Sequence, residues 1–257
     1  MQAFKLFLSL FLVISCTPTL YAQEENGKVD PEVVSRIEEM GKYLRGLKQF
    51  EVKSNFTFEI VTEDNQKFEY PGDLHYKVMN PNKLYAELKS DHKHRKYYYD
   101  GTSMTIYDPK TKFYGQIAAP DTIAELMEQI ENEYKIVLPL EDLFDWGTSK
   151  APTNNIKVAT YIGETKFGEV VVEQFAIRQG NIDWQLWVTK GERPLPKKLI
   201  YTANDDQTRP QFAAELKWNV DPKLKQKDFE FRAPKGSYKI EINPSEEDVV
   251  AKQKAVP

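Results

Sequence analysis

The sequence contains a single cysteine, three histidines and no long apolar run beyond its first residues. One cysteine cannot form a disulfide within the chain. Burial of apolar surface therefore has to stabilise the fold, and a chain of 257 residues is long enough for that. An excess of basic residues is also absent, since 35 Lys and Arg against 39 Asp and Glu give a net charge of −4. This balance argues against nucleic acid as the main partner.

The common catalytic and cofactor motifs are absent as well. The sequence has no glycine-rich phosphate loop, no Gly-x-Ser-x-Gly and no His-Glu-x-x-His. His92 and His94 would face the same side of a strand, but the basic Lys93 between them predicts a charged strand end rather than a metal site. We expect a protein without catalytic residues, metal or cofactor. A hydrolase assembled from distant strands would leave no spacing signature and is a further alternative.

The first residues predict export. Lys5 precedes an apolar run at residues 6–14, which is too short for a membrane-spanning helix and has the length of the hydrophobic part of a secretory signal. Residues 1–22 are therefore the predicted signal peptide, with cleavage after Ala22. The mature chain would be a single domain, residues 23–250, followed by a flexible tail at residues 251–257.

A lipoprotein signal is the alternative at this end of the chain. Residues 13–16 (Val-Ile-Ser-Cys) resemble a lipobox, in which case the signal is residues 1–15 and Cys16 becomes the lipid-bearing first residue. Both alternatives predict a periplasmic location, either as a soluble protein or as an outer-membrane lipoprotein that faces the periplasm.

Hydrophobic periodicity predicts one helix followed by many strands. Asp30 and Pro31 form a helix start, and apolar residues then recur every three or four positions as far as Leu47. From Val52 the period changes to two, as on a strand with one covered face. Short apolar runs between turn residues predict strands at 52–60, 74–79, 84–88, 96–99, 104–107, 113–117, 158–162, 170–177, 184–188, 198–202, 212–220, 229–231 and 238–242.

A second helix is expected to interrupt the strands after Pro120, and a shorter one to follow Pro139. The stripe of apolar residues on the longer inserted helix consists of Ile123, Leu126, Met127 and Ile130. About a dozen strands exceed what an open twisted sheet usually holds, so we expect the sheet to curve, with about 10–12 strands in it. The predicted fold class is mainly β with α. It is a strongly curved antiparallel sheet, an unclosed half-open β-barrel, whose concave face the N-terminal and inserted helices cover.

Segments in both halves of the chain carry a resemblance to a known family. They are residues 80–84, 99–109, Tyr114, Ala119-Pro120 with the helix to Tyr134, 161–163, 175–179, 183–187, 195–198 and Trp218-Asn219. Together they resemble a family of predicted periplasmic proteins of unknown function, which is similar to the LolA/LolB lipoprotein-carrier superfamily. The resemblance implies a half-open barrel with helices in its mouth and a hydrophobic cavity for lipid or a lipid-modified protein. The chain departs from the family at Glu173-Gln174, where members often carry a histidine.

The predicted binding site lies between the concave sheet face and the inserted helix. Its cover would be Ile123, Leu126, Met127 and Ile130. Its wall would be Phe56, Phe58, Leu84, Leu88, Trp184, Leu186, Leu216 and Trp218. We expect a non-enzymatic envelope protein that holds a lipid, or the acyl chain of a lipoprotein, and acts as a carrier.

An interaction or sensing module of the envelope is the alternative function. Such a module would bind a protein partner through the outer sheet face or an edge strand and would have no small-molecule ligand. For both functions we expect a monomer that does not bind nucleic acid and is able to associate peripherally with a membrane.

Overall fold

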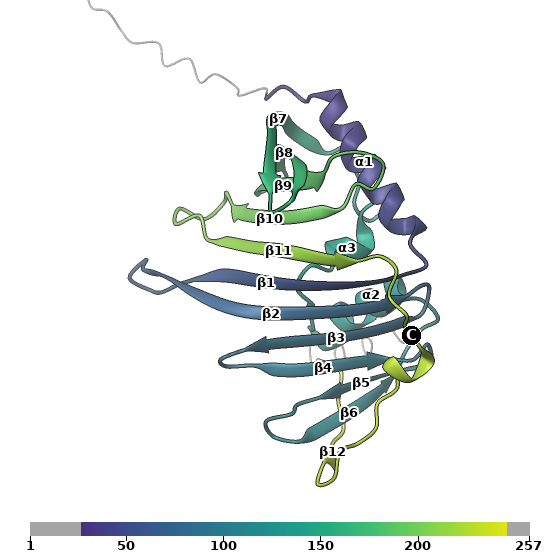
Figure 1. The fold of residues 1–257 in the computed structure, drawn as a ribbon. Coiled ribbons are helices and arrows are strands. Elements are labelled where there is room, and N and C mark those ends of the chain that lie inside the picture. The colour runs from purple at the N-terminus through teal and green to yellow at the C-terminus, as the bar shows by residue number, and fades with distance from the viewer. Residues whose placement is uncertain (1–26, 246–257) are drawn as a thin grey trace, which may run out of the picture.

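Twelve strands form one sheet in the computed structural model, which describes residues 27–245 (Figure 1). The strand order is β12-β6-β5-β4-β3-β2-β1-β11-β10-β9-β8-β7. The predicted signal peptide at 1–22, the alternative lipidation site Cys16 and the predicted tail at 251–257 lie outside the described residues.

The strands form two antiparallel meanders that follow one another in the sequence. The first contains β1 (Gln49–Val61), β2 (Lys67–Met79), β3 (Lys83–Ser90), β4 (His94–Tyr99), β5 (Ser103–Tyr107) and β6 (Phe113–Ala118). The second contains β7 (Ile156–Phe167), β8 (Val170–Gln179), β9 (Ile182–Thr189), β10 (Pro196–Ala203) and β11 (Gln211–Asn219). Each strand pairs with its neighbour in sequence because short turns join them.

The two meanders become one sheet where β1 pairs with β11. This pairing runs from Glu51 opposite Asn219 to Phe58 opposite Phe212. The resulting sheet is wider than flat sheets usually are, and it curves without closing. The mainly β fold class with an unclosed curved sheet is confirmed.

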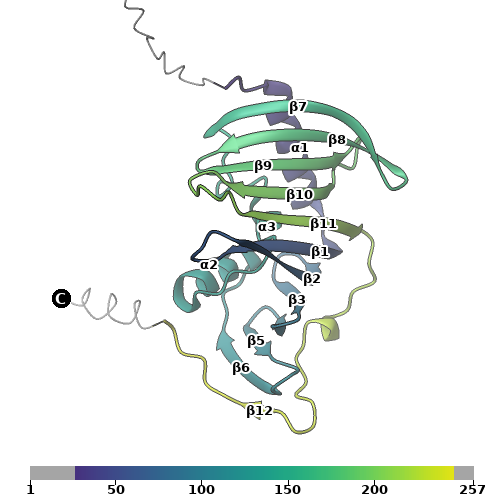
Figure 2. The ribbon, with the colours of Figure 1, turned by 90° about the vertical axis from the view of Figure 1, so that its left-hand side faces the viewer.

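Three helices lie on the same face of the sheet, which we call the inner face (Figures 1 and 2). They are α1 (Pro31–Gly46), α2 (Ile123–Tyr134) and α3 (Asp142–Asp145). The predicted start of α1 is confirmed, because the Asp30 side chain accepts a hydrogen bond of 2.9 Å from the Glu32 amide and Pro31 is the first helical residue. The buried apolar side chains of α1 lie three or four positions apart, as predicted: Val33, Ile37, Met40 and Leu44.

The C-terminal segment differs from the sequence prediction in two places. The expected strand at 229–231 is absent, because a short 3₁₀ helix, Gln226–Asp228, precedes irregular chain. Phe231 instead packs on the opposite, outer face, with its ring centroid 4.9 Å from that of Tyr114. The expected strand at 238–242 shrinks to β12 (Tyr238–Lys239), which pairs with β6 in parallel, so the described sheet is not wholly antiparallel.

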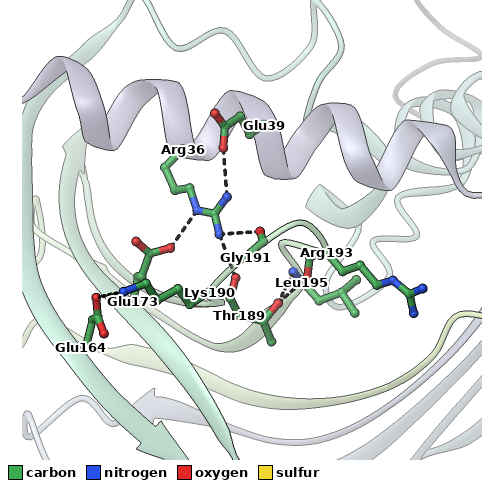
Figure 3. Close-up of polar contacts among 9 residues, drawn as sticks. All are labelled: Arg36, Glu39, Glu164, Glu173, Thr189, Lys190, Gly191, Arg193 and Leu195. Atoms are coloured by element: carbon green, nitrogen blue, oxygen red, sulfur yellow. Dashed lines mark hydrogen bonds and ion pairs between the residues drawn. The ribbon is translucent and has the colours of Figure 1, made fainter.

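Arg36 attaches α1 to the second meander (Figure 3). Its Nε lies 2.8 Å from the Glu173 carboxylate of β8, and its Nη2 donates to the carbonyl oxygens of Thr189 and Gly191 at 2.9 and 3.1 Å. The Arg36 side chain is only 16% exposed, so these bonds are partly shielded from water. The helix is therefore held at this point by a guanidinium group as well as by its apolar face.

We predict that Gly41→Ala destabilises the fold. A Cβ on Gly41 would lie 2.5 Å from the Gly147 amide nitrogen, where α1 packs against the chain that follows α3. This overlap should lower the free energy of unfolding by about 1–3 kcal/mol, even though alanine favours a helix by about 1 kcal/mol. Gly46→Ala, at the end of the same helix with no atom within 4 Å, is the matched control. Urea unfolding that finds both variants equally stable would contradict this prediction.

Candidate functional site

The predicted cover and most of the predicted wall meet in one packed core. The predicted residues in this core are Phe56, Leu84, Leu88, Ile123, Leu126, Met127, Ile130, Trp184, Leu186 and Leu216. A side chain beside a void large enough for water would keep accessible surface, but Leu126 and Leu186 are both 0% exposed. In this conformation the side chains of α2 and of the sheet fill this part of the inner face. An added ligand would have to displace α2.

Two predicted wall residues lie at the margins of this core. Phe58 is 36% exposed near the far end of β1. Trp218 is half-buried, donates its indole N–H to the Pro196 carbonyl oxygen at 2.7 Å, and packs 5.4 Å from the Phe50 ring. Trp218 is thus fixed as a structural residue, whereas Phe58 presents an apolar surface to solvent.

An aromatic row crosses the inner face of five neighbouring strands. It consists of Trp184 on β9, Tyr201 on β10, Phe212 on β11, Phe56 and Phe58 on β1, and Tyr70 on β2. Successive ring centroids in this order are 6.5, 6.3, 5.8, 6.4 and 5.5 Å apart. Trp184 at one end is 5% exposed and Phe58 near the other is 36% exposed. The row therefore leads from the interior to the surface.

The sequence predicted only half of this row. Phe56, Phe58 and Trp184 were candidate wall residues, whereas Tyr201, Phe212 and Tyr70 were not. The alternation in β11 already puts Phe212 on the same face as Leu216. What the sequence could not supply was the pairing that brings β10, β11 and β1 side by side.

A cavity of about 400 Å³ opens at the Trp184 end of the row. Apolar side chains from three parts of the fold line part of it, including Ile37 of α1, Trp146 after α3 and Ile182 of β9, and polar residues such as Lys150 and Asn155 line the rest. The Trp146 and Trp184 rings lie 6.4 Å apart and nearly parallel. This volume lies within the range of ligand pockets in proteins.

Carboxylates from α3 form one side of the same cavity. Asp142 and Asp145 both line it, and burial raises the pKa of each. The Tyr201 hydroxyl donates a hydrogen bond of 2.9 Å to Asp142 Oδ2 and so joins α3 to β10. The neighbouring Glu141 is half-buried, and burial together with the charges of Glu131, Asp142 and Asp145 raises its pKa to about 7.

Tyrosine hydroxyls from the sheet tether the chain on both sides of α2. Tyr99 donates to the Pro120 carbonyl oxygen at 2.5 Å, before the helix, and Tyr76 donates to the Pro139 carbonyl oxygen at 2.7 Å, after it. Between these tethers, α2 contacts the sheet through its apolar stripe, and Glu125, Glu128 and Glu131 face solvent. The helix is thus fixed at its flanks and held by apolar contact in the middle.

Two classes of site are missing from the described part of the chain. Within residues 27–245, no group of three His, Cys, Asp or Glu side chains is arranged to hold a metal ion. His94 instead lies 2.8 Å from the Glu87 carboxylate. No helix among these residues is long and apolar enough to cross a membrane.

Comparison with known proteins identifies the family. The family described as "Predicted periplasmic protein (DUF2092)" matches residues 34–243, which is most of the chain. The chain belongs to this family. The family recognised from the sequence is thereby confirmed, and so is the predicted periplasmic location. No curated protein matches the chain.

Several solved structures are similar to this family member at low sequence identity. LprF from Mycobacterium bovis is 12% identical, with 82% of this chain and 100% of that chain covered and a TM-score of 0.46. The lipoprotein LppX from Mycobacterium tuberculosis is 10% identical, with 75% and 100% covered and a TM-score of 0.45. A LolA superfamily protein from Nitrosomonas europaea is 9% identical, with 77% and 97% covered and a TM-score of 0.35.

We predict that Glu141 makes the stability of the fold depend on pH. A carboxyl with a folded pKa of about 7 and an unfolded pKa near 4.5 binds its proton more tightly in the folded state. Its contribution is therefore present below pH 4.5 and is lost as the pH rises through 7. Because Glu141 is partly exposed, we expect the free energy of unfolding to fall by roughly 1–2 kcal/mol over this range. Relative to the wild type, Glu141→Gln should be more stable at pH 8 than at pH 4.5.

Glu87→Gln is the control, because Glu87 should change stability with pH in the opposite direction. Burial alone would raise the pKa of Glu87, but hydrogen bonds from His94 and Tyr85 and the charge of Lys96 lower it to about 2. Its stabilising contribution is present above pH 4.5 and is lost as the pH falls toward 2. Urea unfolding between pH 2 and pH 8 measures the free energy of unfolding of both variants. A Glu141→Gln difference that stays constant between pH 4.5 and 8 would refute the assignment.

Proposed function

We propose that the protein binds the acyl chain of a lipid or of a lipoprotein on its inner face and carries it within the periplasm. The observation that carries this proposal is the aromatic row, which joins a cavity of about 400 Å³ to an exposed phenylalanine. The row gives an acyl chain a continuous apolar path from the cavity to Phe58, which is 36% exposed.

In this proposal the cavity holds the end of the acyl chain. The aromatic row contacts the part of the acyl chain that leads from the cavity to the surface. Burial of an acyl chain gains about 0.8 kcal/mol per methylene group, so a carrier competes with a membrane only when it encloses most of the chain. The cavity and the exposed end of the row near Phe58 therefore need a cover between them. The polar end of the ligand stays in water beside Phe58 and Tyr70.

Movement of α2 supplies that cover. Its stripe of Ile123, Leu126, Met127 and Ile130 would leave the sheet and pack on the ligand instead, so apolar contact is exchanged rather than lost. The tyrosine bonds to Pro120 and Pro139 keep the flanks in place while the helix shifts. This accounts for a core that is filled when no ligand is bound.

Lipid analysis of the native protein tests this function. Mass spectrometry of organic extracts from protein purified out of its own envelope should find acyl lipids in stoichiometric amount. The purified protein should also take up a pyrene-labelled fatty alcohol. Absence of lipid together with absence of uptake would exclude the proposal.

We predict that Phe58→Ser weakens binding of this probe. Loss of a partly exposed phenylalanine from the row should cost about 1–2 kcal/mol of binding free energy, which is about five- to thirtyfold in affinity. Phe113→Ser is the matched control, because Phe113 is a strand residue of similar exposure, 43% against 36%, and lies outside the row. Fluorescence titration measures both variants. Equal loss in the two, or no loss in Phe58→Ser, would contradict a binding role for the row.

Binding of a protein partner is the second candidate function. The observation that favours it is the dense packing of α2 on the sheet, where Leu126 is 0% exposed. An interaction module needs no internal space, and the outer edge of β7 beyond Ala159 offers backbone groups for strand addition. This function predicts no lipid in the extract and an envelope protein that copurifies.

A further inference from the structure

The outer face of the second meander carries a hollow of about 820 Å³. In Figure 2, α1 lies behind β7–β11, so this face is turned toward the viewer. Two adjacent cross-strand rows form its floor. One row contains Arg178, Asp183 and Thr202, and the other contains Thr160, Ala176 and Gln185. The small side chain of Ala176 leaves depth between its larger neighbours.

Two arginines converge on one carboxylate in this hollow. Arg178 Nε and Nη2 donate to the two Asp183 oxygens at 2.6 and 3.2 Å, and Arg209 Nη2 donates to Oδ2 at 2.8 Å. Asn204 Nδ2 adds a fourth bond at 3.2 Å. The hydrogen bonds from Arg178 and Arg209 hold the pKa of Asp183 well below its usual range, so it stays ionised. The carboxylate thus orients both guanidinium groups at the hollow.

The lining of the hollow is positively charged in a chain of net negative charge. Two arginines, Arg178 and Arg209, line it with one acidic residue, Asp183, whereas the third basic lining residue, Lys67, pairs with Glu59 at 3.0 Å. The chain as a whole carries −4. Arginine presents donors in a fixed planar arrangement that matches the oxygens of a phosphate or carboxylate. The electrostatics of this face therefore favour an oxyanion.

Hydroxyl and amide groups make up the rest of the polar lining. Thr160 and Thr208 contribute hydroxyl groups, and Gln185 and Gln211 contribute amides. Amides both donate and accept hydrogen bonds, which suits the hydroxyl groups of a sugar. The volume lies toward the upper end of the range for small-ligand pockets, so it exceeds what a lone inorganic anion requires.

We infer that the outer face of β7–β11 binds an anionic carbohydrate, whose phosphate or carboxylate lies against Arg178 and Arg209 and whose hydroxyl groups meet the threonines and glutamines. This site lies across the sheet from the aromatic row, and its ligand is hydrophilic. The two proposals are therefore independent. A negative result for carbohydrate binding would not affect the acyl-binding proposal, and a negative result for acyl binding would not affect this one.

Isothermal titration with glucose 6-phosphate, inorganic phosphate and glucose tests the inference. The sugar phosphate should bind saturably, more tightly than either of the other two, and its affinity should fall as salt is added. Arg209→Gln should weaken it roughly tenfold, because one charge-assisted contact is lost. Arg209 is the variant of choice since it lies in the turn between β10 and β11, with its side chain 51% exposed, away from the core.

Arg232→Gln is the matched control, because Arg232 is 84% exposed and does not line the hollow. It should bind the sugar phosphate like the wild type. Absence of saturable binding by any of the three probes would overturn the inference, as would unchanged affinity in Arg209→Gln. Equal affinity for inorganic phosphate and the sugar phosphate would overturn the assignment to a carbohydrate.

Discussion

The pairing of β1 with β11 is the constraint on which the rest of the structure depends. It joins residues that lie far apart in the sequence, such as Phe58 and Phe212, and makes one sheet out of two local meanders. Without it, each meander would be a small sheet with its own apolar face. With it, the apolar faces are continuous, the sheet curves, and the helices α1, α2 and α3 have one common surface to cover. The aromatic row exists for the same reason, since it crosses this junction from Phe212 to Phe56.

The two faces of this sheet have different chemistry. The inner face is apolar and is covered by helices that tyrosine hydroxyls and Arg36 fasten at a few points. The outer face of the second meander carries charged and amide side chains that gather around Asp183, whereas that of the first meander carries aromatic rings around Phe231. Because successive side chains of a strand point to opposite faces, the same strands can bind an apolar ligand on one face and a hydrophilic ligand on the other.

Much of the fold could be predicted from the sequence because its signals are local. The Asp30-Pro31 start of α1, the apolar stripe of α2 and the alternation in β1 each depend on neighbouring residues alone. The expected strand at 229–231 was wrong for a physical reason. The apolar residues of this segment serve packing and not strand pairing. Phe229 is buried, Phe231 packs on the outer face, and neither pairs in a sheet.

The candidate site was less predictable because it is assembled from distant segments. Tyr201, Trp146 and Asp142 meet across α3 and β10, and no spacing in the sequence brings them together. The outer-face hollow leaves no charge run in the sequence either, since it is the pairing of β8 with β9 that sets Arg178 opposite Asp183. Sequence periodicity assigned residues to faces, but only the strand order could show which residues on one face are neighbours.

Photochemical labelling tests the central claim most directly, namely that an acyl chain lies between the aromatic row and the helices. A fatty alcohol with a terminal diazirine would be bound, irradiated and located by peptide mass spectrometry. We expect adducts on the inner face, at Trp146 and Trp184 around the cavity and on the α2 stripe at Leu126 or Met127. Adducts confined to outer-face residues such as Tyr85 or Trp187, or spread evenly over the surface, would contradict the account.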